Sequence, residues 1–143
     1  MDYEKLMRER NVKNAYARYN GIKVTAMSKG AATAEMSITD NMLNPYHIIH
    51  GGCLYTIADV AGGAAATSYG YKVTTVDSSF HYLRAGAGTT KLVATAREIK
   101  AGKTLLVFDI SVMDQNGTLL AEGIFTYMSL GPLESSSESR ASV

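Results

Sequence analysis

The sequence predicts an α+β domain in which an antiparallel sheet of five or six strands wraps around one long central helix. Two observations carry this prediction. Residues 52–69 form a segment that is apolar on nearly every side, as a buried helix would be. The rest of the chain is dominated by extended runs separated by glycine-containing turns, which is typical of antiparallel strands.

Composition limits the possible classes of protein. The chain has 143 residues and is 46% hydrophobic, so we expect one domain over residues 1–132, with the N-terminal helix included. A net charge of +1 gives no case for nucleic-acid binding, and no apolar run is long enough to span a membrane. With a single cysteine and a charged N-terminus, a cytoplasmic location is expected.

The first half of the chain contains a helix, two strands and a loop before the central helix. Residues 2–18 mix apolar and charged side chains and predict a short amphipathic helix. Residues 20–38 predict two strands with a turn near Ser28 to Gly30. Asn44-Pro45 marks a loop over 42–46, and Gly70 is a plausible stop for the helix over 52–69.

Four further strands are predicted over 72–83, 90–100, 103–114 and 118–129. Asn116-Gly117 is a strong hairpin signal, so the last three strands should form an antiparallel meander. Both faces of the final strand are fairly apolar, so we expect one to cover the helix and the other to meet another subunit. The polar tail, 133–143, is expected to be disordered.

The central helix carries one carboxylate, Asp59, among apolar and small residues. A buried carboxylate costs free energy unless it is paired, hydrogen-bonded or neutralised, so its presence points to function. Gly62 and Gly63 in the same helix each cost on the order of 1 kcal/mol relative to alanine. Close approach of another segment is the usual compensation.

Gly51 and Gly52 stand where this helix begins. The first N–H groups of a helix have no internal partner, so they can donate to a carbonyl oxygen or an oxyanion. Asp59 lies eight residues later, about 12 Å along the axis at 1.5 Å per residue. One reacting carbonyl cannot touch both, so joint action requires two subunits with antiparallel helices across a two-fold axis. A monomeric, active chain would contradict this hypothesis.

Simpler interpretations remain for each of these residues. The glycine pair forms an ordinary turn in many proteins, and Asp59 can be a hydrogen-bonded core residue. His50 is more often a loop histidine than a catalyst, and Cys53 is best read as a small core residue. Asn44 can simply form an Asx turn before Pro45.

The order and spacing of these residues resemble the PaaI-like acyl-CoA thioesterases of the hotdog fold. The matching motifs are Asn44, His50-Gly51-Gly52 and Ala58-Asp59, followed by the strand from Thr74 to Gly86 and the closing meander. The resemblance covers about residues 20–130. Pro45 and His47 stand where glycines are often found, and Ala85 where a proline is common.

The resemblance implies a role for each matching position. Asp59 would act as nucleophile or as general base for water, and the Gly51 N–H would polarise the thioester carbonyl. Asn44 and His50 would shape that end of the site, and Thr75 would assist the water. It also implies a homodimer as the minimal active unit, assembled into a homotetramer, and no cofactor beyond the coenzyme A of the substrate.

For the substrate we expect an acyl-CoA, with no metal involved. The acyl group would lie near Gly52, Leu54 and Tyr55, and Lys100 and Lys103 would face the CoA phosphates, although a solvated hairpin tip is the commoner reason for two such lysines. Two other classes stay open. One is a non-catalytic acyl-CoA-binding or regulatory hotdog domain, and the other is a hotdog dehydratase or hydratase.

Overall fold

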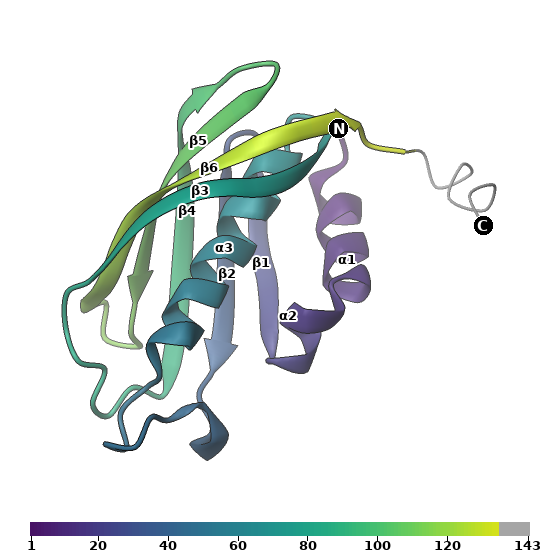
Figure 1. Cartoon of the computed structure of the whole chain (residues 1–143). Helices are drawn as coiled ribbons and strands as arrows, with labels where there is room; N and C mark the ends of the chain where they lie inside the picture. The colour runs from purple at the N-terminus through teal and green to yellow at the C-terminus, as the bar shows by residue number, and fades with distance from the viewer. Residues whose placement is uncertain (135–143) are drawn as a thin grey trace.

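The computed structural model describes residues 1–134, in which a six-stranded antiparallel sheet curves around one long helix (Figure 1). The strands are β1 (Ile22–Ser28), β2 (Ala31–Ser37), β3 (Tyr71–Tyr82), β4 (Lys91–Ala101), β5 (Leu105–Met113) and β6 (Leu119–Pro132). Their order in the sheet is β1-β2-β4-β5-β6-β3. The predicted fold class, the hairpin over 20–38 and the closing meander are therefore confirmed.

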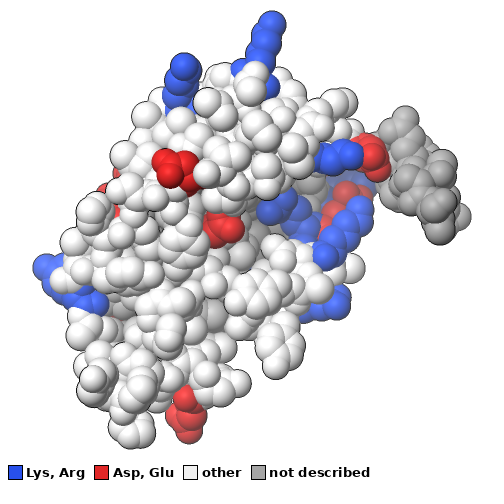
Figure 2. Space-filling view, viewed as in Figure 1, with Lys and Arg blue, Asp and Glu red and all other residues white. Residues whose placement is uncertain are grey.

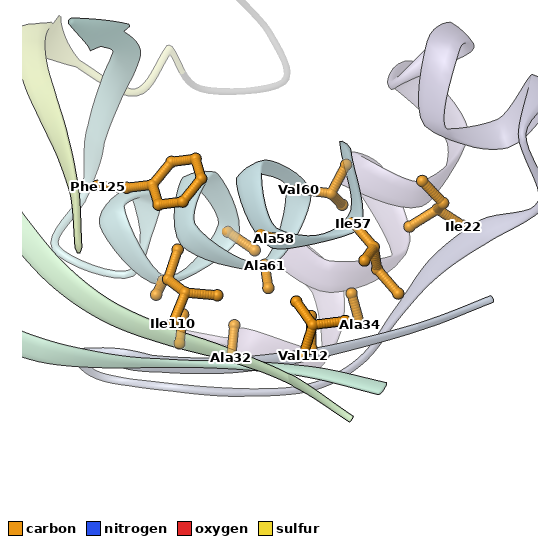
Figure 3. Close-up of a cluster of buried hydrophobic side chains, with 14 of the residues drawn as sticks. Ile22, Ala32, Ala34, Ile57, Ala58, Val60, Ala61, Ile110, Val112 and Phe125 are labelled. Carbon is orange, nitrogen blue, oxygen red and sulfur yellow. The ribbon is translucent and has the colours of Figure 1, made fainter. Parts of the chain in front are cut away.

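Helix α3 (Gly51–Thr67) lies in the concave side of this sheet. Helix α3 and the sheet pack closely against each other. Figure 3 shows the reason: Ala58 and Ala61 of the helix face Ala32 and Ala34 of β2. All four alanines are buried, and larger side chains such as Ile110 and Phe125 fill the remaining space. The small residues of α3 thus set the spacing between helix and sheet.

The packing of the core explains why position 62 is a glycine. A Cβ atom there would overlap the Tyr127 hydroxyl and would lie 2.6 Å from Ile110 Cδ1. A Cβ at Gly63 would instead lie 3.3 Å from Nη2 of Arg10. The predicted close approach to both glycines is observed, and it is made by side chains of β5, β6 and the N-terminal segment.

The N-terminal segment differs from the single helix predicted over 2–18. It forms α1 (Tyr3–Lys13) and α2 (Ala15–Tyr19), and Asn14 caps α2 by accepting a hydrogen bond from the Ala17 N–H. Helix α1 buries no residue. Its Asn11 exchanges two hydrogen bonds with the backbone of Val24 in β1, which fixes the helix beside the sheet. Capping by asparagine at an internal position divides the helix.

The turns and the C-terminal end follow the sequence signals closely. In the β5–β6 hairpin Gly117 has φ of 78°, while Asp114 accepts from the N–H groups of Asn116 and Thr118. Strand β6 extends to Pro132, and the Leu133 N–H donates to Gly70. Only residues 133–134 of the predicted disordered tail are described; the rest lies outside the described residues.

The two edges of the sheet are β1 and β3. Strand β3 is long, and its residues 74–77 are exposed. On the outer face of the sheet Ile124 is 47% exposed, which agrees with the apolar outer face predicted for the final strand. In the described part of the chain, no helix is long and apolar enough to cross a membrane, and no cluster of three metal-ligating side chains occurs.

Candidate active site

Asp59 lies on α3 at the level of the β3–β6 pair Thr75 and Tyr127, and its side chain is half-buried. Its Oδ1 accepts a hydrogen bond of 2.8 Å from the Thr75 hydroxyl and one of 3.0 Å from the Tyr127 hydroxyl. Within residues 1–134, Oδ2 accepts none. One carboxylate oxygen is therefore fixed by two donors, while the other is available to a ligand or a water.

Tyr127 is the principal site residue that the sequence analysis missed. Burial, reinforced by the Asp59 carboxylate, raises the pKa of its hydroxyl above the ordinary value, so it remains a donor at neutral pH. It lies on β6 on the same face as Phe125, and both are buried. A tyrosine on a face that covers a helix needs a buried hydrogen-bond partner, and that requirement was the available signal.

A hollow of about 330 Å³ opens beside Asp59. It lies between α3, the start of β3 and the two N-terminal helices. Besides Asp59, Thr75 and Tyr127, its walls include Arg10, Asn14, Tyr16, Tyr55, Thr56, Val60, Gly63, Val73 and Thr74. Figure 2 shows that charges are sparse over α3 and that basic side chains gather on the α1 side. The site thus combines one carboxylate and one guanidinium, those of Asp59 and Arg10, with a wall that is otherwise largely apolar, aromatic and hydroxyl-bearing.

The beginning of α3 has the donor geometry that its glycines predict. His50 is the N-cap, and its Nδ1 accepts a hydrogen bond of 2.8 Å from the Gly52 N–H. In the described part of the chain the Gly51 N–H has no acceptor. A Cβ at Gly51 would lie 3.1 Å from Tyr82 Cε1, so glycine makes room for the Tyr82 ring beside the beginning of the helix.

Gly51 and Asp59 do not share a hollow within one chain. Gly51 lines a separate hollow of about 290 Å³ with Leu54, Tyr82 and the segment 83–86. Both residues belong to one continuous helix, which separates them by about 12 Å. Leu54 therefore lies at the Gly51 end, whereas Tyr55 lines the Asp59 hollow and its hydroxyl lies 2.6 Å from that of Ser78.

The remaining predicted residues lie farther from Asp59. Asn44 accepts hydrogen bonds from the N–H groups of Tyr46 and Ile48, which is the Asx-type turn considered above. His50 and Gly52 line a third hollow, of about 650 Å³, between α2 and α3. Lys100 and Lys103 are exposed at the β4–β5 turn and line none of these three hollows.

The hotdog architecture, with a helix carboxylate beside a small hollow, fits a thioester hydrolase. The family comparison agrees, because residues 46–121 match the model of the thioesterase superfamily. This protein belongs to the thioesterase superfamily.

Individual relatives give the same result. The acyl-coenzyme A thioesterase PaaI of Escherichia coli is 33% identical over 108 residues, covering 76% of this chain and 77% of PaaI. The structure of E. coli PaaI superposes with a TM-score of 0.87, at 28% identity over 93% of this chain and 96% of that one.

Two structural neighbours were solved with a coenzyme A ligand. The smu.793 protein of Streptococcus mutans, bound to acetyl-CoA, has a TM-score of 0.74 and 28% identity over 79% of this chain and 91% of its own. A hypothetical thioesterase of Streptococcus pneumoniae, solved with coenzyme A, has a TM-score of 0.79 and 26% identity over 90% and 99%.

Proposed function

We propose that this protein hydrolyses acyl-CoA thioesters to a free acid and coenzyme A. The observation that carries the proposal is the hydrogen bonding of the two oxygens of the Asp59 carboxylate. Oδ1 is held by Thr75 and Tyr127, and Oδ2 is left without a partner among the described residues and can face the hollow. A fixed carboxylate with one free oxygen suits a general base or a nucleophile.

In the general-base route Oδ2 removes a proton from a water, and the resulting hydroxide adds to the thioester carbonyl. The carbonyl oxygen, now negative, accepts a hydrogen bond from Gly51. Collapse of the tetrahedral intermediate breaks the C–S bond, and the CoA thiolate takes up the proton. In the nucleophilic route Oδ2 itself adds to the carbonyl, CoA leaves, and water hydrolyses the resulting anhydride. Both routes need the same oxygen.

The active unit in this proposal is a homodimer, with Asp59 from one subunit and the Gly51 N–H from the other. Helix geometry supports it, because the two groups lie about 12 Å apart on one helix and line different hollows. The exposed edge of β3 offers a surface for antiparallel pairing around a two-fold axis, since an unpaired edge strand is a template for another chain. The exposed apolar outer face of the sheet, which includes Ile124, suits further assembly into a tetramer.

The coenzyme A part of the substrate is proposed from the relatives, one of which is named an acyl-CoA thioesterase and two of which were solved with CoA ligands. Lys100 and Lys103 are exposed cations suited to the CoA phosphates. In the assembled dimer Leu54, Tyr55 and Gly52 would surround the acyl group, while Asn44 and His50 would hold the loop and helix start that present Gly51.

The test is thiol release from a panel of acyl-CoAs by the wild-type protein and by Asp59→Asn. We expect release by the wild type and a loss of at least about a hundredfold in the variant. Asp40→Asn, an exposed aspartate in a short helix, is the matched control and should be fully active. Full activity of Asp59→Asn would refute the mechanism. Binding without release by the wild type would instead favour a regulatory domain.

A further inference from the structure

Arg10 in the Asp59 hollow has no role in the reaction described above. It comes from α1, and its side chain lines the same hollow as Asp59 and Tyr127. Its Nε is fully buried and has no hydrogen-bond partner, and no carboxylate of the described residues lies within 4.0 Å of its nitrogens. A guanidinium with a buried, unpaired Nε is poorly solvated, so an occupant of the hollow that supplies an acceptor to its Nη groups would be favoured.

The packing around Arg10 accommodates its side chain with Nε buried and unpaired. Gly63 leaves room for the guanidinium, because a Cβ there would lie 3.3 Å from Nη2. Burial lowers the pKa of Arg10, while Tyr127 and Asp59 act in the opposite direction. An arginine keeps its charge in proteins. Its side chain lines the hollow that also holds the free oxygen of Asp59, and its Nη donors, unlike the buried Nε, are left for an acceptor.

The hollow limits what the ligand can be. At about 330 Å³ it is at the lower end of the range for small-molecule sites, which run from about 300 to 1,000 Å³. Its other walls include the side chains of Tyr16, Tyr55, Val60 and Val73. A compact acyl group fits such a space, and a plain hydrocarbon would leave the guanidinium without an acceptor.

We propose that Arg10 is a specificity residue that donates hydrogen bonds to an oxygen carried by the acyl group of the substrate. This inference rests on the proposed thioesterase function and specifies its substrate class as compact acyl groups bearing a hydroxyl or a carboxylate away from the thioester. A carboxylate matches the planar guanidinium with two parallel hydrogen bonds, and a hydroxyl accepts one.

The experiment compares kcat/KM for matched acyl-CoAs of four, five and six carbons. Each length is used with a terminal methyl, hydroxyl or carboxylate; for five carbons these are pentanoyl-, 5-hydroxypentanoyl- and glutaryl-CoA. We expect the wild type to prefer at least one oxygen-bearing series over its hydrocarbon by about tenfold or more, because a donor site rejects the analogue that lacks the acceptor. Whether the hydroxyl or the carboxylate is preferred identifies the acceptor.

The variant Arg10→Met should remove the preference, with the hydrocarbon rate held within about threefold. Arg10→Lys keeps the charge with fewer donors and should lower the preference by about threefold or more; it provides a second test if the methionine variant does not fold. Arg8→Met is the matched control, since Arg8 lies on the same helix with its side chain 67% exposed. It should keep the full preference.

Three results would overturn the inference. They are a wild type that releases thiol from all series without preference, an unchanged preference in both Arg10 variants, and an equal loss on all substrates in Arg10→Met. The last would show that Arg10 supports Asp59 rather than reading the acyl group. Failure of the proposed function has a different signature, namely no thiol release by the wild type from any member of the panel.

Discussion

The hydroxyl of Tyr127 lies 3.0 Å from Oδ1 of Asp59 and 3.2 Å from the backbone carbonyl oxygen of the same residue. A side chain from the sheet therefore ties both the backbone and the carboxylate of one helix residue. This contact passes over Gly62, whose missing Cβ leaves space for the hydroxyl. The orientation of Asp59 is thus set by the packing of β6 against α3.

Replacing Tyr127 with phenylalanine tests that relationship. The variant removes one of the two donors to Oδ1 and keeps the buried ring, so we expect kcat to fall about tenfold with little change in KM. Tyr46→Phe, at a loop tyrosine that is 81% exposed, is the control and should be neutral. Wild-type kcat in Tyr127→Phe would mean that Thr75 alone positions the carboxylate.

Gly51→Pro removes the N–H assigned to the substrate carbonyl. Proline is well tolerated at the first position of a helix, and His50 before it already has the extended backbone that proline requires. We expect a loss of about a hundredfold in kcat with the helical circular dichroism retained. Gly51→Ala adds the same Cβ near Tyr82 but keeps the N–H, and it should retain far more activity. Equal losses in the two variants would assign the effect to the Cβ.

Mixing two inactive variants tests whether the site is shared between subunits. A dimer of one Asp59→Asn chain and one Gly51→Pro chain contains one intact site, formed by Gly51 of the first and Asp59 of the second. With random exchange, we expect recovery to about a quarter of wild-type activity, since half of the dimers are mixed and each has one of its two sites. No recovery, with exchange verified by mass spectrometry, would place the whole site in one chain.

Stability measurements on the two helix glycines should give opposite results. Alanine at Gly62 meets Tyr127 and Ile110 in the packed core, so we expect the free energy of unfolding to drop by about 1–3 kcal/mol despite the better helix propensity. Alanine at Gly63 meets the end of the Arg10 side chain and is in ordinary contact with Tyr127 Cε1 at 3.9 Å, so it should be neutral or stabilising. Urea unfolding of both variants decides the point, and a stabilised Gly62→Ala would contradict the packing described here.

Alkaline pH should destabilise the protein partly through Tyr127. Burial, followed in size by the effect of Asp59, raises the pKa of this tyrosine in the folded state above the ordinary tyrosine value of 10.0. As pH rises past that value the unfolded chain ionises and the folded one does not, so the free energy of unfolding falls by about 1.4 kcal/mol per pH unit from this group. Tyr127→Phe should show a shallower decline between pH 10 and 11 in urea unfolding; an identical slope would exclude the contribution.

The fold was predictable because its signals are local. Apolar periodicity located α3 and the strands to within a few residues, and Asn116-Gly117 located the last hairpin. The split of the N-terminal segment was missed because Asn14 at an internal position reads as an ordinary polar residue until its side chain caps α2. The extension of β6 to Pro132 depends on pairing with Tyr71, a contact distant in sequence.

The candidate site was predictable only in part. The family resemblance assigned Asp59 and Thr75 to one site, and a hydrogen bond joins them; the Gly51 N–H is unpaired among the described residues. Arg10 could not be identified, because it lies among other charged residues of α1 and enters the hollow only through tertiary packing. Tyr127 and Arg10 come from opposite ends of the chain, and no spacing rule connects such residues to Asp59.

Helix α1 has no fully buried residue; Asn11 bonds it to Val24 of β1, and Met7 packs against the core. The helix nevertheless supplies Arg10 to a wall of the hollow. Substitutions in this helix that spare Met7 and Asn11 leave these contacts intact, and a change at Arg10 alters the wall of the hollow. New substrate preferences can evolve in the N-terminal segment without any change to the carboxylate or the sheet that supports it.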